Sequence, residues 1–281
     1  MEQQHQSNPL SQYFRQFKLY MKLPSGTSYY KPGTINFTDN GEIGIMPMTG
    51  KDELILKNPD ALLNGEAIIE VIKSCVPGVT NAKLLLTNDI DALITAIRYA
   101  TYDDKLETAI NCPSCKHENL FKLDLQYALG NMSYLESEYV VNLDSGLSIF
   151  VKPYGFPELI KGLHAQFEQG KISRAIESEN LTEDQRFKLF SSAFKELSIV
   201  TYELMVNSII KVVDENNNIN VNDKIFIKDF LQNIDKKSID KISDQIKEIN
   251  LIGIKKTFVA KCEKCNHEWE NEIDFNPVNF S

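Results

Sequence analysis

The chain has 281 residues, of which 42% are hydrophobic and 25% are charged, and its formal net charge is −9. This length is sufficient for one large domain or two ordinary ones around a sizeable apolar core. The negative charge argues against non-specific binding of nucleic acid, which depends on neutralising phosphates. No apolar run approaches the roughly 20 residues that a membrane-spanning helix needs, and the polar start of the chain lacks the apolar core of a signal peptide. We therefore expect synthesis in a reducing cytoplasm and no insertion in a membrane.

The N-terminal third is predicted to be a small α+β domain. Residues 1–12 are expected to form a flexible arm, and the domain itself is expected to span residues 13–104. Apolar and polar residues alternate in Thr34–Thr38 and in Glu42–Met46, as they do in half-buried strands. Asn40-Gly41 lies between the two runs, and both of its residues tolerate positive φ. This pattern predicts a β-hairpin made of the two runs.

Helical patterns follow the predicted hairpin. Thr49 and Asp52 are spaced as a capping box, which predicts a short helix over Lys51–Lys57. A longer helix, capped at position 87 or 88, is predicted to continue to about Ala100. Its apolar residues recur at helical spacing on one face, and they are Ile90, Leu93, Ile94 and Ile97.

Two short motifs in the chain share the pattern C-x-x-C-x-H-E. They are Cys112-Pro113-Ser114-Cys115-Lys116-His117-Glu118 and Cys262-Glu263-Lys264-Cys265-Asn266-His267-Glu268. Each lies between runs that predict strands, which are Leu106–Ile110, Leu120–Leu125, Thr257–Ala260 and Trp269–Phe275. A strand, a turn with two thiols and a returning strand form a zinc knuckle, and two knuckles supply the four thiolates of a closed structural Zn²⁺ site. We therefore predict that Cys112, Cys115, Cys262 and Cys265 bind one structural Zn²⁺ in a split zinc ribbon, residues 105–126 plus 250–276.

Other interpretations of the cysteines are a disulfide pair, a redox dithiol and two half-sites completed by other molecules. Disulfides need an oxidising compartment, and a thioredoxin-like dithiol lies at a helix N-terminus, whereas these pairs lie between predicted strands. His117 and His267 occupy equivalent positions and are alternative ligands, although four thiols already complete a structural site. A fifth cysteine, Cys75, is expected to be a buried small hydrophobic residue.

The region between the two knuckles is predicted to be mainly helical. Residues 127–155 are expected to form a connector that contains a β-hairpin, and residues 156–249 are expected to form a helical insert. Thr182 and Gln185 form a second capping box, and the helix that it opens is predicted to extend as far as Val213. The predicted fold class is therefore α+β: an N-terminal α+β domain, a split four-cysteine zinc ribbon and a helical module inserted between its halves.

Several short runs resemble the T4-type bacteriophage baseplate protein family, which is associated with assembly of the central baseplate hub of contractile tails. They include Lys22-Leu23-Pro24-Ser25-Gly26, Met46-Pro47-Met48-Thr49-Gly50-Lys51-Asp52-Glu53, Leu86-Thr87-Asn88-Asp89, Arg98-Tyr99 and Cys112-Pro113-Ser114-Cys115. The resemblance implies a phage structural or tail-assembly protein with no catalytic residues. It also implies other baseplate or tail proteins as partners, an oligomeric setting within the baseplate, and a place in the virion tail after assembly in the host cytoplasm.

We therefore expect a non-enzymatic protein that acts through protein–protein contacts, because the sequence also shows no nucleophile–base constellation. The alternative function is a nucleic-acid-binding or transcription-associated zinc-ribbon module. Such a module usually presents a basic face interleaved with aromatic residues, whereas lysines and glutamates are mixed around both knuckles.

Overall fold

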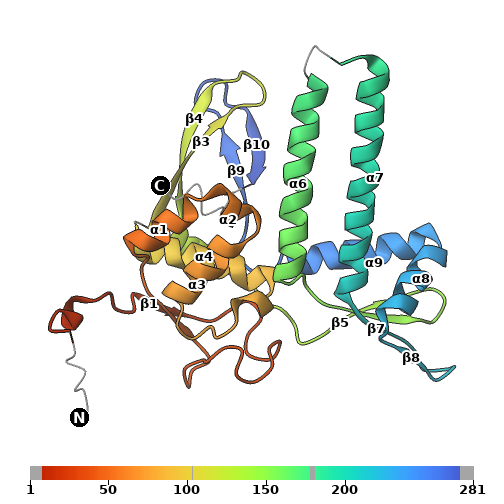
Figure 1. Ribbon diagram of the computed structural model, residues 1–281, viewed down its shortest axis with the longest axis horizontal. Coiled ribbons are helices and arrows are strands. Elements are labelled where there is room, and N and C mark those ends of the chain that lie inside the picture. The colour runs from red at the N-terminus through yellow and green to blue at the C-terminus, as the bar shows by residue number, and fades with distance from the viewer. Residues whose placement is uncertain (1–7, 103, 178–180, 273–281) are drawn as a thin grey trace, which may run out of the picture.

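The computed structural model describes residues 8–102, 104–177 and 181–272. It is a mixed protein of helices and strands with two cores and two projections that point the same way (Figure 1). Among the described residues, no helix is long and apolar enough to cross a membrane.

The N-terminal body is built around helix α4, which spans Thr87–Thr101 and is buried along most of its length. Helix α3 (Glu66–Cys75) packs against it, and so does strand β2 (Ile43–Ile45), which forms a two-stranded sheet with β1 (Leu19–Met21). Helices α1 (Gly50–Leu56) and α2 (Pro59–Leu63) pack against α3. Fully buried side chains at the centre of this core are Leu23, Ile45, Ile72, Leu93 and Ile97. The buried Cys75 belongs to this core, as expected of a small hydrophobic residue.

The chain before β1 is attached to this body through Arg15. Its guanidinium donates to the main-chain oxygens of Pro47 (2.7 Å) and Ser74 (2.6 Å) and pairs with the buried carboxylate of Asp52 at 3.3 Å. Of the predicted flexible arm, residues 1–7 lie outside the described residues, and Ser11–Tyr13 forms a short 3-10 helix.

The second core belongs to a module that includes both the predicted connector hairpin and the predicted insert. Strands β5 (Tyr139–Asn142), β6 (Ser148–Val151), β7 (Ile209–Asp214) and β8 (Ile219–Val221) form an antiparallel sheet in that order. Helices α8 (Lys224–Asn233) and α9 (Lys236–Asn250) pack with this sheet and contribute to the same core. Its fully buried isoleucines are Ile149, Ile209, Ile227, Ile242 and Ile249.

One projection is a helical hairpin whose first helix begins against the N-terminal core and whose second helix ends in this module (Figure 1). Helix α6 spans Phe156–Glu177 and helix α7 spans Glu183–Ser208, and the two run side by side. Near the base of the hairpin, Lys161 and Glu203 form an ion pair of 2.9 Å. The other projection carries the four cysteines of the C-x-x-C motifs.

Both capping boxes are confirmed: the hydroxyl oxygen of Thr49 accepts from the Asp52 N–H, and that of Thr182 accepts from the Gln185 N–H. The predicted length of the second helix is wrong. α7 ends at Ser208, and the next six residues form strand β7, which pairs with β6. This segment is rich in β-branched residues, which favour strands, and pairing with β6 places the side chain of Ile209 in the core.

The predicted hairpin of Thr34–Thr38 with Glu42–Met46 is also wrong. The turn itself forms, because Gly41 adopts a φ of 72° and its N–H donates to the oxygen of Thr38. However, β2 pairs with β1, and Ile35 makes only an isolated bridge with Val79. Strand β2 therefore pairs with β1, more than 20 residues upstream, instead of with the adjacent run Thr34–Thr38.

The N-terminal body and the module are joined by buried polar contacts at the start of α4. The side-chain amide of Asn88 donates to the main-chain oxygens of Ile249 (2.9 Å) and Ile252 (2.7 Å), just where α9 ends. The next residue, Asp89, accepts from the Ser25 N–H (2.9 Å), and burial raises the pKa of its carboxyl to about 6. Lys256 then pairs with Asp91. These contacts fix the position from which the chain enters the second C-x-x-C motif.

Candidate metal centre

The two C-x-x-C-x-H-E motifs fold into the same turn. In the first motif, the Cys112 N–H donates to the oxygen of His117 (2.8 Å), and the Lys116 N–H donates back to the oxygen of Cys112 (2.9 Å). In the second motif, Cys262, Asn266 and His267 make the equivalent two bonds, both of 2.9 Å. Lys116 and Asn266 have φ values of 60° and 57°, a left-handed conformation that costs a lysine roughly 1–2 kcal/mol. The same turn therefore forms in both motifs even where the residue does not favour it.

Each turn closes a two-stranded hairpin. The first cysteine hairpin consists of β3 (Lys105–Asn111) and β4 (Glu118–Asp124), and the second consists of β9 (Thr257–Lys261) and β10 (Glu268–Glu272). They form separate sheets that lie side by side in the projection (Figure 1). The first hairpin is rooted in the N-terminal body through the buried side chains of Leu106 in β3 and of Leu125, which directly follows β4 and begins helix α5 (Leu125–Gly130). Of the predicted strand Trp269–Phe275, residues 273–275 lie outside the described residues.

The turns bring the four predicted cysteines together. The Sγ atoms of Cys112 and Cys265 are 3.7 Å apart, those of Cys115 and Cys262 are 3.6 Å apart, and all four lie within 4.8 Å of one another. The pairs cross from one hairpin to the other, and all four thiols are free. Sulfur atoms at the corners of a tetrahedron around Zn²⁺, with bonds of about 2.3 Å, would be roughly 3.8 Å apart. The four thiols therefore fit a tetrahedrally coordinated metal ion.

Burial and hydrogen bonding prepare the site for a cation. Cys112 and Cys262 are fully buried, whereas Cys115 is half-buried and Cys265 is exposed at the surface. Desolvation opposes ionisation of Cys262, but hydrogen bonds from the N–H groups of Cys265 and Lys264 and from the neighbouring thiols outweigh it and lower the pKa of the Cys262 thiol to about 6. Ionisation of this thiol is therefore favoured, and binding of a metal would favour loss of the remaining protons.

The two histidines of the motifs contribute main-chain atoms to the turns. The oxygens of His117 and His267 accept the cysteine N–H groups, and the metal-binding group found in the described residues consists of the four cysteines. The ring of His267 stacks on Trp269, with centroids 6.0 Å apart and an interplanar angle of 11°. The His267 ring therefore packs against an aromatic side chain.

Sequence reasoning missed one polar residue at this centre, Asn119. Its side chain is buried, with an exposed fraction of 2%. The amide nitrogen donates to the oxygen of His117 (2.9 Å), and the amide oxygen accepts the N–H of Glu263 (2.9 Å). The equivalent position in the second motif is Trp269, so the repeat gives no sign of a shared role.

Aromatic side chains pack the two cysteine hairpins against each other below the thiols. The ring of Phe121 lies 5.3 Å from that of Phe258 and 6.2 Å from that of Trp269, in edge-to-face arrangements that favour aromatic pairs. Opposite charges pair on the outer surfaces, as in Lys122–Glu107 (2.7 Å). The surface near the centre is thus mixed in charge, as the sequence indicates.

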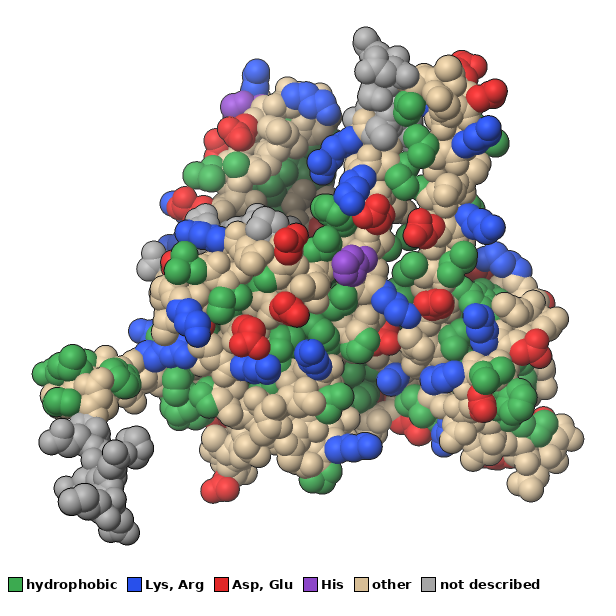
Figure 2. Space-filling view, viewed as in Figure 1, with side chains coloured by type: hydrophobic (Ala, Val, Ile, Leu, Met, Phe, Trp, Pro, Cys, Tyr) green, Lys and Arg blue, Asp and Glu red, His purple; other side chains and the backbone are tan. Residues whose placement is uncertain are grey.

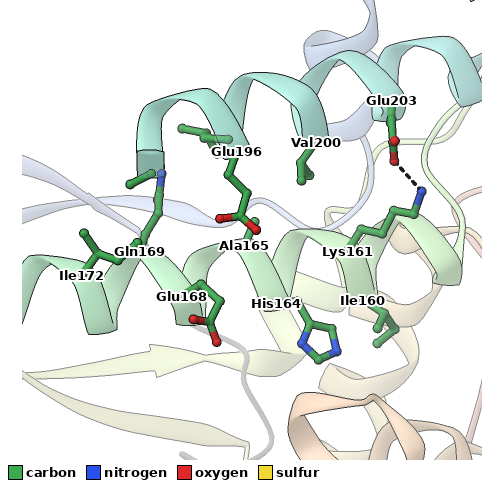
Figure 3. A pocket seen from close by; sticks show the side chains of 12 residues that line it. Ile160, Lys161, His164, Ala165, Glu168, Gln169, Ile172, Glu196, Val200 and Glu203 are labelled. Atoms are coloured by element: carbon green, nitrogen blue, oxygen red, sulfur yellow. Dashed lines mark hydrogen bonds and ion pairs between the residues drawn. The ribbon is translucent and has the colours of Figure 1, made fainter. Parts of the chain in front are cut away.

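A second candidate site is a groove of about 320 Å³ between α6 and α7 (Figure 3). Apolar side chains contributed by both helices form part of its lining, and the Lys161–Glu203 ion pair spans it. His164 and Glu168 lie on α6 and point away from α7, whereas Glu196 projects from α7 toward α6. These side chains do not converge on one point as acid–base chemistry requires. The groove is therefore better suited to packing than to a reaction.

Comparison with known families gives one result. The family model described as T4 bacteriophage base plate protein matches residues 15–280, which includes both cysteine motifs and the whole module. Comparison with curated proteins and with solved structures gave no match.

Proposed function

The chain belongs to the T4 bacteriophage base plate protein family, and we propose that it is a non-enzymatic structural or assembly component of the hub region of a contractile-tail baseplate. The observation that carries this proposal is the family match over nearly the whole chain. The proposed partners are other baseplate and tail proteins, in an oligomeric setting, and the proposed location is the virion tail after assembly in the host cytoplasm.

We further propose that Cys112, Cys115, Cys262 and Cys265 bind one structural Zn²⁺ and that the two cysteine hairpins form a split zinc ribbon. The sulfur–sulfur distances of 3.6 and 3.7 Å support this assignment. Four thiolates fill the coordination shell, so the ion would stabilise structure and leave no position for a substrate. Its binding free energy would contribute directly to folding.

The α6–α7 hairpin is the proposed docking surface for tail proteins. Phe187, Phe190 and Phe194 follow one another at helical spacing on α7, and their exposed fractions are 72%, 62% and 65%. Apolar side chains gather along this hairpin in the space-filling view (Figure 2). A group of exposed apolar side chains on one surface is more often a protein–protein contact site than an ordinary solvent-facing surface.

The proposed role is tested by a quantitative mass-spectrometric inventory of purified tails and of baseplate assembly intermediates. We expect the chain in one or both at a fixed stoichiometry relative to the other baseplate proteins. Absence of the chain from both preparations would contradict the proposed role. If the purified chain also bound DNA or RNA in a salt-sensitive way, the nucleic-acid-binding alternative would be supported instead.

For the metal, we expect one zinc per chain in protein purified without added chelator. Elemental analysis and native mass spectrometry measure this directly. Cys75→Ala is a matched control, because Cys75 lies in the N-terminal core, and this variant should retain the full zinc content. Two zinc ions per chain, or none with all four motif thiols alkylated in the folded protein, would show that the single-site assignment is incorrect.

A further inference from the structure

The two cysteine hairpins are attached to the rest of the protein in different ways. The first is continuous with the N-terminal core through Leu106 and Leu125. The second follows the turn at Gly253, whose N–H donates to the hydroxyl oxygen of Ser133 (3.0 Å). Beyond Lys256, the described residues of the second hairpin contact the first through the Glu263–Asn119 hydrogen bond, the aromatic pairs and the thiols. The residues that provide these contacts therefore control whether the four thiols meet.

We propose that Asn119 is a positioning residue that holds the second cysteine turn against the first and so pre-organises the four thiols for the metal. This inference rests on the proposed zinc site. The side chain of Asn119 is buried and is bonded at both ends to the main chain of a metal-binding turn. His117 closes the first turn by accepting from Cys112. Glu263 lies between the two cysteines of the second turn.

The two bonds of Asn119 act in a way that the aromatic contacts do not. Burial of Phe121, Phe258 and Trp269 favours association of the hairpins, but this driving force is non-directional. A hydrogen bond constrains both the distance and the angle of its partners. The hydrogen bond that the Glu263 N–H donates to Asn119 therefore fixes the position of the second turn relative to the first. This in turn fixes the positions of Cys262 and Cys265.

Pre-organisation increases affinity because less ordering remains to be done when the ligand binds. Residues that orient metal ligands typically change metal affinity by about 10–100-fold when they are replaced. We expect Asn119→Leu to weaken binding by a factor in that range. The substitution keeps the number and the branching of the side-chain heavy atoms and removes both hydrogen bonds. The coordination itself should stay the same, since all four thiols remain.

The experiment measures the affinity of the full-length metal-free protein for Co²⁺ and Zn²⁺ by competition with a chelator, and records the Co²⁺ absorption spectrum. Asn111→Leu is the matched control, because Asn111 lies on the same hairpin and is exposed. We expect a spectrum typical of four sulfur ligands for wild type and both variants. The affinity should fall about 10–100-fold for Asn119→Leu and be nearly unchanged for Asn111→Leu. Equal affinities in the two variants would overturn the proposal.

A second measurement does not depend on metal binding. Mild oxidation of the metal-free wild type should link cysteines of different turns, Cys112 with Cys265 and Cys115 with Cys262, because these thiols are already adjacent. In Asn119→Leu, the yield of these links should fall relative to links within a turn. An unchanged pattern would overturn the proposal even if this variant bound metal too weakly to titrate. Failure of the wild type to bind either ion would instead contradict the proposed zinc site.

Discussion

Cys262→Ser is expected to release the second cysteine hairpin. On heating, the hairpin should unfold in the first melting transition, and the midpoint temperature of this transition should be lower than in the wild type by roughly 10 °C or more. Structural zinc contributes on the order of 10 kcal/mol in small zinc domains, which is comparable to the net stability of a typical domain, about 5–15 kcal/mol. Three thiolates bind the ion more weakly than four. Without a firmly bound ion, the contacts between the described residues that still hold the second hairpin against the first are those of Asn119 and the aromatic cluster.

The release should be local. Ile252 accepts from Asn88, and Lys256 pairs with Asp91, so the chain up to Lys256 is held independently of the metal. Limited proteolysis with mass-spectrometric mapping should therefore find new cleavage sites after Lys256, while the N-terminal body and the module resist. His267→Ala is the control, since its ring lies on Trp269 and outside the group of thiols. If Cys262→Ser melts like the wild type and His267→Ala loses the metal, then the histidine belongs to the ligand set.

Removal of the outer part of the α6–α7 hairpin should have the opposite effect: little loss of stability and a large loss of incorporation into tails. Replacing residues 165–199 with a short glycine-rich loop keeps the Lys161–Glu203 pair and the sheet of the module. None of the described residues in the deleted segment belongs to either core. The melting temperature should therefore change by less than about 5 °C, equivalent to roughly 1–2 kcal/mol.

The matched comparison is a full-length variant in which Phe187, Phe190 and Phe194 are all replaced by alanine. It should lose incorporation to the same extent, whereas Phe226→Ala, which changes an exposed phenylalanine on α8, should not. Incorporation is measured in particles from a phage that lacks its own copy of the gene. Normal incorporation of the shortened protein would show that the hairpin is dispensable for docking.

Short-range signals in the sequence predicted the local structure well. The capping boxes at Thr49 and Thr182 form as expected, because their hydrogen bonds involve residues only three positions apart. The long apolar stripe of α4 likewise lies in the core. The two errors concern pairings that local patterns do not specify: β2 pairs with β1 instead of Thr34–Thr38, and β7 pairs with β6, which precedes the whole α6–α7 hairpin. Periodicity shows that such a segment can be a strand, but it does not identify the partner.

The same distinction applies to the candidate centre. The repeated motif predicted that Cys112, Cys115, Cys262 and Cys265 would meet, because two matched half-sites are each incomplete alone. Asn119 was not predictable in this way, since its role depends on the geometry between the hairpins and its counterpart in the second motif is a tryptophan. The stripe of phenylalanines on α7 was visible in the sequence, but only the structure shows that the stripe is exposed.

The separation of the two cysteine turns also determines when the centre can form during synthesis. Cys112 and Cys265 are 153 positions apart, and ribosomes add about 5–20 residues per second, so the first pair of thiols waits roughly 8–30 s for the second. During this interval the N-terminal body and the module can fold as units. A nascent chain that stops before Cys262 would carry an open pair of thiols, so closure of the four-thiol centre distinguishes a chain translated past the second motif from one interrupted before it.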